Sequence, residues 1–594
     1  MSAIDRVRAL RDEMAQHRVD YYVVPSADAH QSEYVPKAWQ RRPWLSGFTG
    51  SVGDCVIGRE GAWQWADSRY WLQAEAELDP AVWTLMRQGD AGVPNLAAWL
   101  GGLPAGSVVG FDPRLVGLAA SRDMARQVEG AGARVLPIED NLVDRVWSDR
   151  PSLPLDHAAP WPEAFSGQSV AAKLAALRAA TGDAGADALV LTTLDAIAWT
   201  FNLRGTDVAF NPVVIAYGVV SREPDAATLF IDPRKLDASA RAHLAAAGVT
   251  AAPYDAFAEH LDTLGGRVLV DEDHVSAWIV GRLEAAGADV IARRSPVMLM
   301  KARKNATEQD GMRAAHLRDA VAMVRFFAWL ETAWRGGALD EIAASDRLEA
   351  FRAEGERFVG LSFDTISGFA SNGAIVHYRA SEATSKRIDD STLYLLDSGA
   401  QYLDGTTDIT RTVHLGSPTA AQREHYTRVL RGHLQLGRVR FPHGTTGTHL
   451  DALARTPLWE AGLNYGHGTG HGVGCYLSVH QGPHRISPHP NDVPLEPGMV
   501  VSNEPGLYLA GEYGIRVENL CLVVPAPSAS AQAFYAFEDL TLVPYCRALI
   551  APELLSPVER DQVDAYHARV RAALTDRVPA EVRPWLERET APLA

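Results

Sequence analysis

Short apolar runs separated by glycine, proline and aspartate recur along the first half of the chain. The run at 21–24 predicts a strand and leads to Leu45-Ser-Gly-Phe-Thr-Gly50, and the run at 188–191 leads in the same way to Phe201-Asn-Leu-Arg-Gly-Thr206. Two further pairs follow in the same order: Trp65-Ala-Asp-Ser-Arg69 with Phe230-Ile-Asp-Pro-Arg234, and Val109-Gly-Phe-Asp112 with Leu269-Val-Asp271. An offset of about 160 residues is far longer than a solenoid repeat, so the pattern predicts two copies of one α/β domain.

Two breaks in the pattern predict domain boundaries. Residues 151–162 are rich in proline, which lacks an amide donor and interrupts helices, so this stretch is interpreted as a connector. The second boundary is expected at 301–305. After it, Thr307-Glu-Gln-Asp310 resembles a capping box that opens a long amphipathic helix ending at Gly336-Gly337, and a second helix is expected over 339–353. Strand-like runs follow, so the last domain is predicted to be α+β.

One predicted hairpin carries two aspartates. The runs 393–399 and 406–412 flank Asp404-Gly405, which is a strong hairpin signal. A two-residue turn at that dipeptide would leave Asp397 and Asp408 about 13 Å apart. A four-residue turn would place Gly399 opposite Asp408 and bring both carboxylates within reach of a metal pair, so we expect the wider turn.

A second predicted hairpin carries two glutamates. Glu504 and Glu518 have Gly511 at their midpoint, so a turn around that glycine would bring them face to face. His467-Gly-Thr-Gly-His471 has the spacing of a helical zinc pair, but its glycines favour a strand or loop, in which only one of the two histidines reaches a given ion. Four carboxylates and one imidazole form an oxygen-rich set that predicts a hydrolase with two hard divalent ions.

Two other histidines are less clear from their spacing. His377, in Asn372-Gly-Ala-Ile-Val-His377-Tyr378, and His480, in Leu477-Ser-Val-His480, each end an apolar run, and their spacing alone favours a hydrogen-bonded core position over a functional role. A phosphate cradle at the glycines of 466–474 is disfavoured, because no P-loop lysine or following helix accompanies them.

Composition narrows the classes of function. The chain has 594 residues, 47% of them apolar, and 73 acidic against 56 basic side chains, a formal charge of −17. This excess of acid disfavours a nucleic-acid or anionic membrane surface. The first ten residues have no apolar core of a signal peptide, and four scattered cysteines without a C-x-x-C spacing indicate a reducing compartment. A cytoplasmic protein without nucleic-acid or membrane partners is therefore expected.

The motifs resemble the Xaa-Pro aminopeptidase, or aminopeptidase P, family of the three-domain cytosolic type. The resemblance rests on the segments quoted above together with Leu396-Asp-Ser-Gly-Ala-Gln-Tyr402, Gly405-Thr-Thr-Asp-Ile-Thr-Arg411, Gly466-His-Gly-Thr-Gly-His-Gly-Val-Gly474, Ser502-Asn-Glu-Pro-Gly506 and Gly514-Ile-Arg-Val-Glu-Asn519. It extends to Asp28-Ala-His-Gln-Ser-Glu-Tyr34, Asp67-Ser-Arg-Tyr70 and Trp585-Leu-Glu-Arg-Glu-Thr590, with Ser68 where glycine is usual.

This resemblance implies a fold and a site. The fold is two creatinase-like α/β domains, 1–160 and 161–303, followed by a pita-bread catalytic domain with a C-terminal extension, 304–594. Asp397 would cap one metal ion, His471 and Glu504 would bind the other, and Asp408 and Glu518 would bridge them. The ions are expected to be Mn²⁺, with Zn²⁺ or Co²⁺ as alternatives. The residues expected to contact substrate are Arg69, His377, His467, His471 and His480.

The expected activity is removal of the N-terminal residue from peptides with proline in second position, by a metal-bridged hydroxide that attacks the X-Pro carbonyl. Glu504, His377 and His480 are the expected catalytic residues, and Arg516 is either a second layer of the site or a simple salt bridge to one of the acids. A homodimer is expected from the same resemblance. Two rival interpretations are a prolidase, which usually lacks the duplicated half, and an inactive relative, which would have lost metal ligands.

Overall fold

The computed structural model describes residues 1–223 and 226–593. The chain forms two compact units. The first is built from Met1–Pro162 and Gln168–Met298, and the second from Glu163–Gly167 and Leu299–Ala594. Each unit has its own hydrophobic core and is treated separately below.

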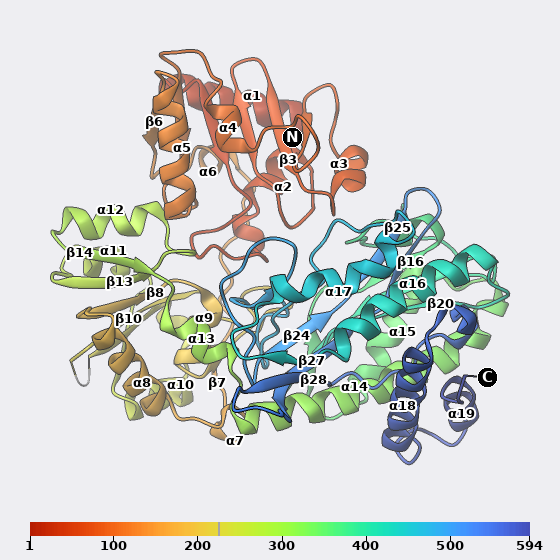
Figure 1. The fold of residues 1–594 in the computed structure, drawn as a ribbon. Coiled ribbons are helices and arrows are strands. Elements are labelled where there is room, and N and C mark those ends of the chain that lie inside the picture. Colours follow the sequence, from red (N-terminus) through yellow and green to blue (C-terminus); the bar gives the residue numbers. More distant parts are fainter. Residues whose placement is uncertain (224–225, 594) are drawn as a thin grey trace. The chain divides into compact units, whose positions relative to one another are not determined.

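The first unit contains two six-stranded sheets of the same design (Figure 1). The first sheet has the order β4-β3-β2-β1-β5-β6 and the second has the order β12-β11-β10-β8-β13-β14. The strands of the first are β1 (Tyr21–Val24), β2 (Cys55–Gly58), β3 (Ala62–Ala66), β4 (Thr84–Arg87), β5 (Val108–Phe111) and β6 (Arg134–Pro137). Those of the second are β8 (Ala188–Leu191), β10 (Ala216–Ser221), β11 (Ala227–Ile231), β12 (Val249–Ala252), β13 (Arg267–Asp271) and β14 (Asp289–Arg293).

The two sheets agree in detail, which confirms the predicted duplication. In each, the central strand pairs antiparallel on one side and parallel on the other. Asp67 after β3 accepts hydrogen bonds from the backbone and guanidinium of Arg69, and Asp232 after β11 accepts the same set from Arg234. The main helices of this unit are α1 (Ala3–Gln16), α5 (Leu118–Gly130), α8 (Val170–Asp183), α10 (Ala238–Ala246) and α12 (Ala277–Ala285).

The second unit begins with a long helix, α14 (Ala306–Ala333). Asn305 is its N-cap, and Glu308 closes the capping box by accepting the Asn305 N–H at 3.0 Å. The box predicted at Thr307-Glu-Gln-Asp310 is therefore wrong by two residues. Asn305 takes the cap position because its side-chain amide also donates to Ser166 O at 2.8 Å, a contact between distant segments that the local pattern does not contain.

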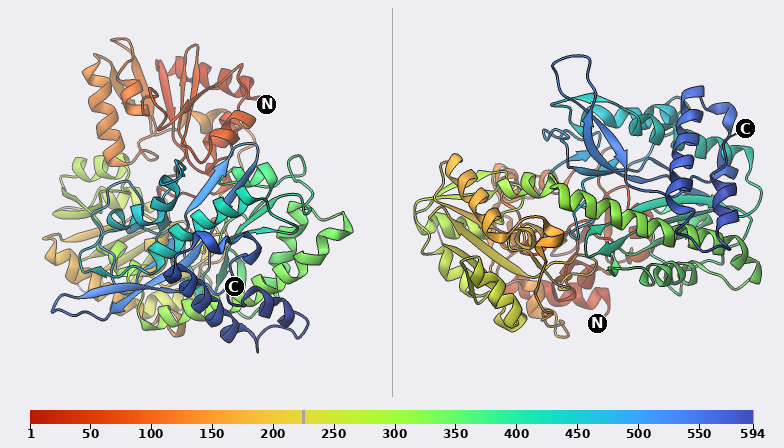
Figure 2. Two further views of the ribbon diagram at one scale, coloured as in Figure 1. Left: turned by 45° about the vertical axis from the view of Figure 1, so that its right-hand side comes forward. Right: turned by 90° about the horizontal axis from the view of Figure 1, so that it is seen from below.

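The helices of the second unit surround small, twisted sheets (Figure 2). After α14 come α15 (Glu341–Ala353), α16 (Ala420–Gly437), α17 (Gly447–Trp459), α18 (Pro557–Leu574) and α19 (Arg583–Glu589). The strands that carry the motifs are β16 (Ile366–Phe369), β17 (Leu393–Ser398), β18 (Ala400–Tyr402), β19 (Gly405–Thr406), β20 (Ile409–His414), β22 (Gly470–His471), β23 (Arg485–Ile486), β24 (Val500–Asn503), β25 (Gly506–Leu509), β26 (Tyr513–Arg516), β27 (Asn519–Ala526) and β28 (Phe534–Asp539). Helix α16 packs against β24, β25 and β26, and α15 packs against β16. This is the mixed helix-and-strand fold that was expected for the catalytic domain.

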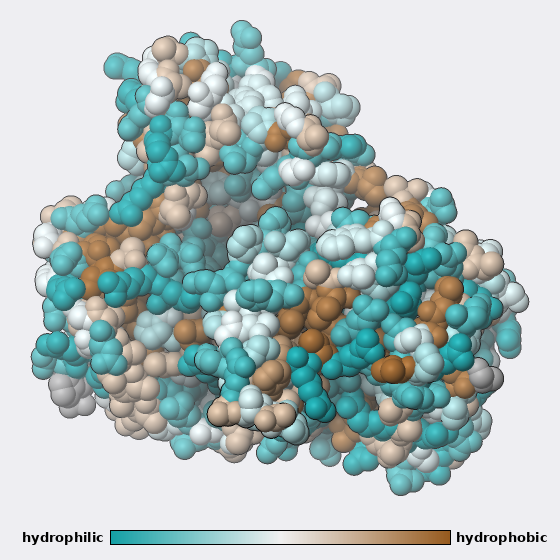
Figure 3. All heavy atoms as spheres, in the orientation of Figure 1, coloured by the Kyte–Doolittle hydropathy of each residue, from teal (hydrophilic) through white to brown (hydrophobic). Residues whose placement is uncertain are grey.

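The face seen in Figure 3 is a mosaic of hydrophilic residues with scattered hydrophobic ones. Isolated large apolar side chains such as Trp459 and Val558 are exposed, at 51% and 57%. Among the described residues, no helix combines the length and apolar content that crossing a bilayer requires.

Candidate metal centre

The first hairpin places Asp397 and Asp408 on one face. Ser398 pairs with Ile409 across β17 and β20, and Tyr402 pairs with Gly405 across β18 and β19. Both ladders have the same register, which sets Gly399 opposite Asp408 as expected. The turn is nevertheless two residues long, Leu403-Asp404, so the four-residue turn predicted from the sequence is wrong.

The turn lies at Leu403-Asp404 because Asp404 and Gly405 both make contacts with other segments of the chain. The Asp404 carboxylate pairs with Arg318 and with Arg357, the latter at 2.6 Å. A Cβ on Gly405 would stand 2.8 Å from the Ala315 side chain of α14, so glycine is needed there for close packing against the helix. The dipeptide is therefore an attachment point to α14 rather than a hairpin corner.

The second hairpin confirms the predicted pairing of the glutamates. Leu509 pairs with Tyr513 across the turn, and Asn503 pairs with Asn519 at the far end. The same register places Glu504 opposite Glu518. Gly511 lies in the turn with φ +79°, a conformation that favours glycine.

His471 lies in the short strand β22, as its glycine-rich surroundings predicted. A Cβ on Gly470 would meet Ser502 O at 1.9 Å, and one on Gly472 would meet Gln481 O at 2.0 Å. These glycines let three backbone segments approach each other closely, which accounts for them without a phosphate ligand. The His471 N–H donates to Ser502 Oγ at 2.9 Å, and this fixes the strand beside β24.

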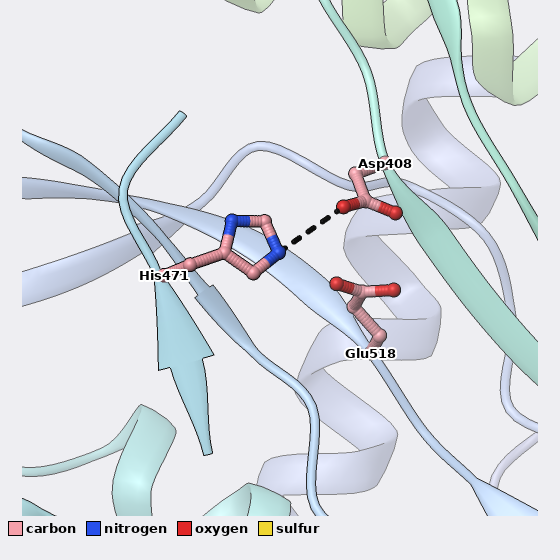
Figure 4. A group of neighbouring side chains, drawn as sticks. All are labelled: Asp408, His471 and Glu518. Atoms are coloured by element: carbon pink, nitrogen blue, oxygen red, sulfur yellow. Dashed lines mark ion pairs between the residues drawn. The ribbon is translucent and has the colours of Figure 1, made fainter. Parts of the chain in front are cut away.

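The imidazole of His471 presents Nε2 to the acids. Its Nδ1 lies 3.0 Å from Gly472 O, and since a carbonyl only accepts, Nδ1 donates this hydrogen bond and Nε2 is the nitrogen that faces the acids. Nε2 is 3.4 Å from an oxygen of Asp408 and 3.6 Å from one of Glu504. One ligand atom each from Asp408, His471 and Glu518 lies within 4.8 Å of the others, and Figure 4 shows the three side chains pointing toward one another.

The cluster holds more negative charge than its surroundings balance. Burial, followed by the charges of Asp397 and Glu504, raises the pKa of Asp408 well above its usual value. Burial and the charge of Asp408 do the same to the pKa of Glu518. Burial and the charge of Glu518 raise the pKa of Glu504 to about 7. Like charges this close are unfavourable without a counter-ion.

Two oxygens of the cluster have no hydrogen-bond donor. Oδ1 of Asp397 and Oε1 of Glu518 are buried and unpartnered. Unpaired buried carboxylate oxygens are rare in proteins, and together with the crowded charge they fit a site for divalent cations. The five residues predicted as metal ligands thus lie in one unit and interact with one another.

Arg516 is the guanidinium that pairs with an acid of the cluster. Its Nη2 donates to Asp397 Oδ2 at 2.6 Å, and its Nε donates to Thr410 Oγ1 at 3.0 Å. Thr410 in turn donates to Glu518 Oε2 at 2.8 Å. Arg516 is therefore both a salt bridge and a second layer of the site, the two alternatives that the sequence left open.

The predicted substrate histidines have different surroundings. The ring of His480 lies 4.3 Å from that of His471, centroid to centroid, so His480 borders the cluster. His467 Nε2 lies 2.8 Å from Tyr508 Oη, which also accepts from Arg516 at 2.6 Å. His467 is thus connected to Asp397 through Tyr508 and Arg516, as expected for a second-layer contact.

His377 follows Val376, whose backbone oxygen accepts from Arg516 Nη2 at 3.5 Å, and Arg69 lies in the other unit. His377 is half-buried in a loop whose neighbours Asn372 and Tyr378 both donate to the buried Glu341 carboxylate. Arg69 belongs to the first unit and forms a bidentate pair with Asp67 at 2.7 and 3.0 Å. The contact of either residue with substrate stays a prediction.

Sequence reasoning missed three residues that support the site. Thr410 bonds to Glu518, Ser502 Oγ donates to Glu504 Oε1 at 3.4 Å, and Tyr508 bridges Arg516 and His467. Thr410 and Ser502 stand two residues from Asp408 and Glu504. A strand of period two places such residues on the same face, and this signal could have found them.

Family models match consecutive parts of the chain. Residues 310–525 match metallopeptidase family M24. Two models of the creatinase/prolidase N-terminal domain match residues 6–146 and 149–308. The model of the C-terminal region of peptidase M24 matches residues 533–593.

Two known proteins match the chain over its full length, and a third matches part of it. A protein of Fusarium vanettenii described as "Probable Xaa-Pro aminopeptidase P" is 42% identical, with 100% of both chains covered. The crystal structure of X-prolyl aminopeptidase from Caenorhabditis elegans, described as a cytosolic enzyme with a di-nuclear active site, is 35% identical and has a TM-score of 0.96 over 100% of both chains. Xaa-Pro dipeptidase from Bacillus anthracis is 26% identical with a TM-score of 0.50, and covers 64% of this chain and 99% of its own.

Proposed function

This chain belongs to metallopeptidase family M24, and from that premise we propose that it is a metal-dependent aminopeptidase that removes the N-terminal residue from peptides with proline in second position. The observation that carries the proposal is the group of two buried carboxylates, Asp408 and Glu518, and the half-buried His471, with ligand atoms within 4.8 Å of one another, in a chain that aligns end to end with Xaa-Pro aminopeptidases.

Two divalent ions fit this site. Asp397 would hold one, His471 and Glu504 the other, and Asp408 and Glu518 both. The support is the unpartnered oxygens of Asp397 and Glu518 and the raised pKa values of Asp408 and Glu518. When bound, the ions would lower the pKa of water and polarise the scissile carbonyl as Lewis acids. We propose Mn²⁺ because the set is rich in oxygen, with a single imidazole.

The chain's own residues would then move the proton. Glu504, whose pKa rises to about 7, suits a group that accepts a proton from the attacking water and returns it to the proline nitrogen. His480, beside His471, would donate a hydrogen bond to the oxyanion, and His377 is proposed for the same task. Arg69, His467 and His471 are proposed to complete the contacts with the peptide.

The chemistry of the bond explains why such a site suits proline. An X-Pro linkage is a tertiary amide with no N–H and a rigid ring, so a cleft that hydrogen-bonds the N–H cannot seat it. A site that activates the carbonyl oxygen and the nucleophile needs no such donor. Carboxylates near the free amine of the substrate would limit cleavage to the first residue.

The larger organisation is proposed on the same basis. We infer domains at 1–160, 161–303 and 304–594, of which residue 594 lies outside the described part of the chain. The separate six-stranded sheets and the family matches that end at 146 and 308 support these bounds. A homodimer and a cytoplasmic location are also proposed, the latter because the Caenorhabditis elegans relative is described as cytosolic.

Peptide digestion tests the proposed function. The purified protein, loaded with Mn²⁺, should release arginine from Arg-Pro-Pro, and mass spectrometry should show Pro-Pro as the second product. A chelator should stop the reaction and Mn²⁺ should restore it. Release of product from an Arg-Pro dipeptide but not from Arg-Pro-Pro would instead identify a prolidase. No cleavage of either peptide by the metal-loaded protein would overturn the proposal.

A further inference from the structure

The C-terminal segment, residues 543–593, contacts residues beside the proposed metal centre. Helices α18 and α19, dark blue in Figures 1 and 2, pack against α14, and α18 also packs against α16. None of the catalytic roles assigned above uses this segment. Its buried polar groups nevertheless hydrogen-bond Arg411 and His433, which in turn hydrogen-bond Asn519 and Asn503, the residues next to Glu518 and Glu504.

Arg411 makes the first connection. It is 1% exposed and lies three residues after Asp408 on β20. Its Nη1 donates to the backbone oxygen of Glu518 at 2.5 Å, and its Nη2 to the side-chain oxygen of Asn519 at 2.8 Å. The guanidinium therefore connects β20, which directly follows Asp408, to the segment that carries Glu518, and it forms no hydrogen bond with either carboxylate.

The C-terminal segment holds this guanidinium from the other side. Nη2 of Arg411 also lies 2.7 Å from Val543 O and 3.0 Å from the Tyr566 hydroxyl, and Nε lies 3.1 Å from Pro544 O. The Tyr566 hydroxyl donates in turn to Val543 O at 2.9 Å. A planar guanidinium that is hydrogen-bonded on two sides has a fixed orientation. The contact with Tyr566 therefore helps to orient the Arg411 N–H groups toward the backbone oxygen of Glu518.

A second connection reaches Glu504. Nδ1 of His433 lies 3.0 Å from Asn503 O and must donate to it, and burial lowers the pKa of His433 to about 4, so the ring is neutral. Nε2 therefore accepts, and the Tyr545 hydroxyl donates to it at 3.1 Å. Asn503 pairs with Asn519 in the β24–β27 ladder, one residue from each glutamate. The two connections meet at this pair.

We propose that Tyr566 and Tyr545 of the C-terminal segment are positioning residues of the metal centre: through Arg411 and His433 they set the separation of Glu518 and Glu504, and hence the affinity for divalent ions. The inference rests on the proposed function. This role differs from general packing because Arg411 and His433 hydrogen-bond Asn519 and Asn503, which are adjacent to Glu518 and Glu504. Groups in this layer typically change metal affinity by about 10–100-fold when removed.

Substitution of one hydroxyl tests the proposal. Tyr566→Phe removes the contact to Arg411 and keeps the ring. Tyr426→Phe is the matched control, since Tyr426 is a fully buried tyrosine of the same core whose hydroxyl accepts the Cys546 N–H at 3.1 Å and forms no hydrogen bond with Arg411 or His433. For each variant, Mn²⁺ affinity is measured by competition with a chelator, and thermal stability and the kinetics on Arg-Pro-Pro are measured in parallel.

Tyr566→Phe should bind Mn²⁺ about tenfold more weakly and lose a similar factor in kcat at subsaturating Mn²⁺, while KM changes by less than about twofold. Tyr426→Phe should lose comparable thermal stability and keep wild-type Mn²⁺ affinity. Equal Mn²⁺ affinity in the two variants would overturn the inference. If Tyr566→Phe does not fold, Tyr545→Phe is judged by the same criterion. A wild-type protein that binds Mn²⁺ but leaves Arg-Pro-Pro intact refutes the proposed function alone, because the affinity comparison does not depend on turnover.

Discussion

Two buried groups of charged side chains in the second unit balance their charge in different ways. Arg352 of α15 meets Asp319 of α14 in a bidentate pair at 2.8 and 3.1 Å, and the Tyr402 hydroxyl adds a third hydrogen bond to the aspartate at 3.0 Å. In the second group, four acids lie together, and within the described residues the guanidinium of Arg516 forms an ion pair with one of them, Asp397. The first group is complete as a protein interaction, whereas the second is complete only with added positive charge.

The largest expected effect follows from removing one acid of the cluster. Asp408→Asn should lower kcat/KM on Arg-Pro-Pro by about 1,000-fold or more, since it takes away a ligand of both proposed ions. The same change should leave the metal-free protein as stable as before or more stable, because it relieves the repulsion that raises the pKa of Asp408. Thermal unfolding in a chelator, together with kinetics, measures both.

Asp310→Asn is the control for this substitution, because Asp310 lies on α14 with its side chain 79% exposed. It should change neither activity nor metal-free stability. An Asp408→Asn protein that is clearly less stable than this control in the absence of metal would show that the charges of the cluster are balanced without a metal ion. That result would contradict the difference drawn between the two buried groups.

Breaking the complete pair should have the opposite signature. Arg352→Met leaves Asp319 buried without its cation and should destabilise the second unit by about 3–5 kcal/mol, with metal affinity affected only as far as the fold is lost. Urea unfolding measures the change. Arg588→Met, at a surface pair with Glu331, should cost less than about 1 kcal/mol. A loss of the same small size at Arg352 would argue against the importance of the buried pair.

A smaller effect is expected from the proposed proton carrier. Glu504→Gln keeps the size of the side chain but removes its base, and should lower kcat by about 100-fold at saturating Mn²⁺. Metal content, measured on the same sample, separates a lost proton carrier from a lost ion. Turnover near the wild-type value in a fully loaded variant would assign the proton transfer to another group.

The smallest effect concerns pH and the metal-free protein. The pKa of Glu504 rises from 4.5 to about 7, so the folded state binds the proton more tightly than the unfolded state. Between these pH values the folded state carries more protons, and stability should fall as pH rises, by at most about 1.4 kcal/mol per pH unit. Above pH 7 this contribution should be flat.

The difference in unfolding free energy between wild type and Glu504→Gln isolates this slope. Burial lowers the pKa of His433 from 6.5 to about 4, so the stability that neutral His433 contributes is lost as pH falls from 6.5 to 4. This slope has the opposite sign, but it is the same in both proteins and cancels in the difference. A difference that stays constant from pH 5 to 7 would mean that burial and the neighbouring acids do not raise the pKa of Glu504.

The pairing of the proposed metal ligands was largely predictable, and the reason is local. Glu504 and Glu518 are symmetric about Gly511, and a hairpin with that midpoint pairs them whatever surrounds it. The register that sets Gly399 opposite Asp408 was also predicted. The duplicated domains were predicted because the same short motifs recur in order and each motif forms the same strand and turn.

The errors arose where distant segments compete with local preference. Asp404-Gly405 is a good turn by composition, yet Arg318, Arg357 and the close approach of α14 use it otherwise. The capping box moved to Asn305 because that side chain also contacts Ser166. Both contacts join residues far apart in the sequence, so a local sequence pattern of a few residues cannot predict them.

The sequence by itself thus determined which side chains could bind metal, the strand pairing that brings them together two by two, and the duplication of the first half. Only the tertiary structure decided that the two hairpins and His471 share one buried group, that Arg516 and Thr410 link Asp397 to Glu518, and that the C-terminal segment supports both glutamates. Periodicity and turn chemistry act over a few residues, whereas burial, charge balance and the aim of a guanidinium depend on residues more than a hundred positions apart.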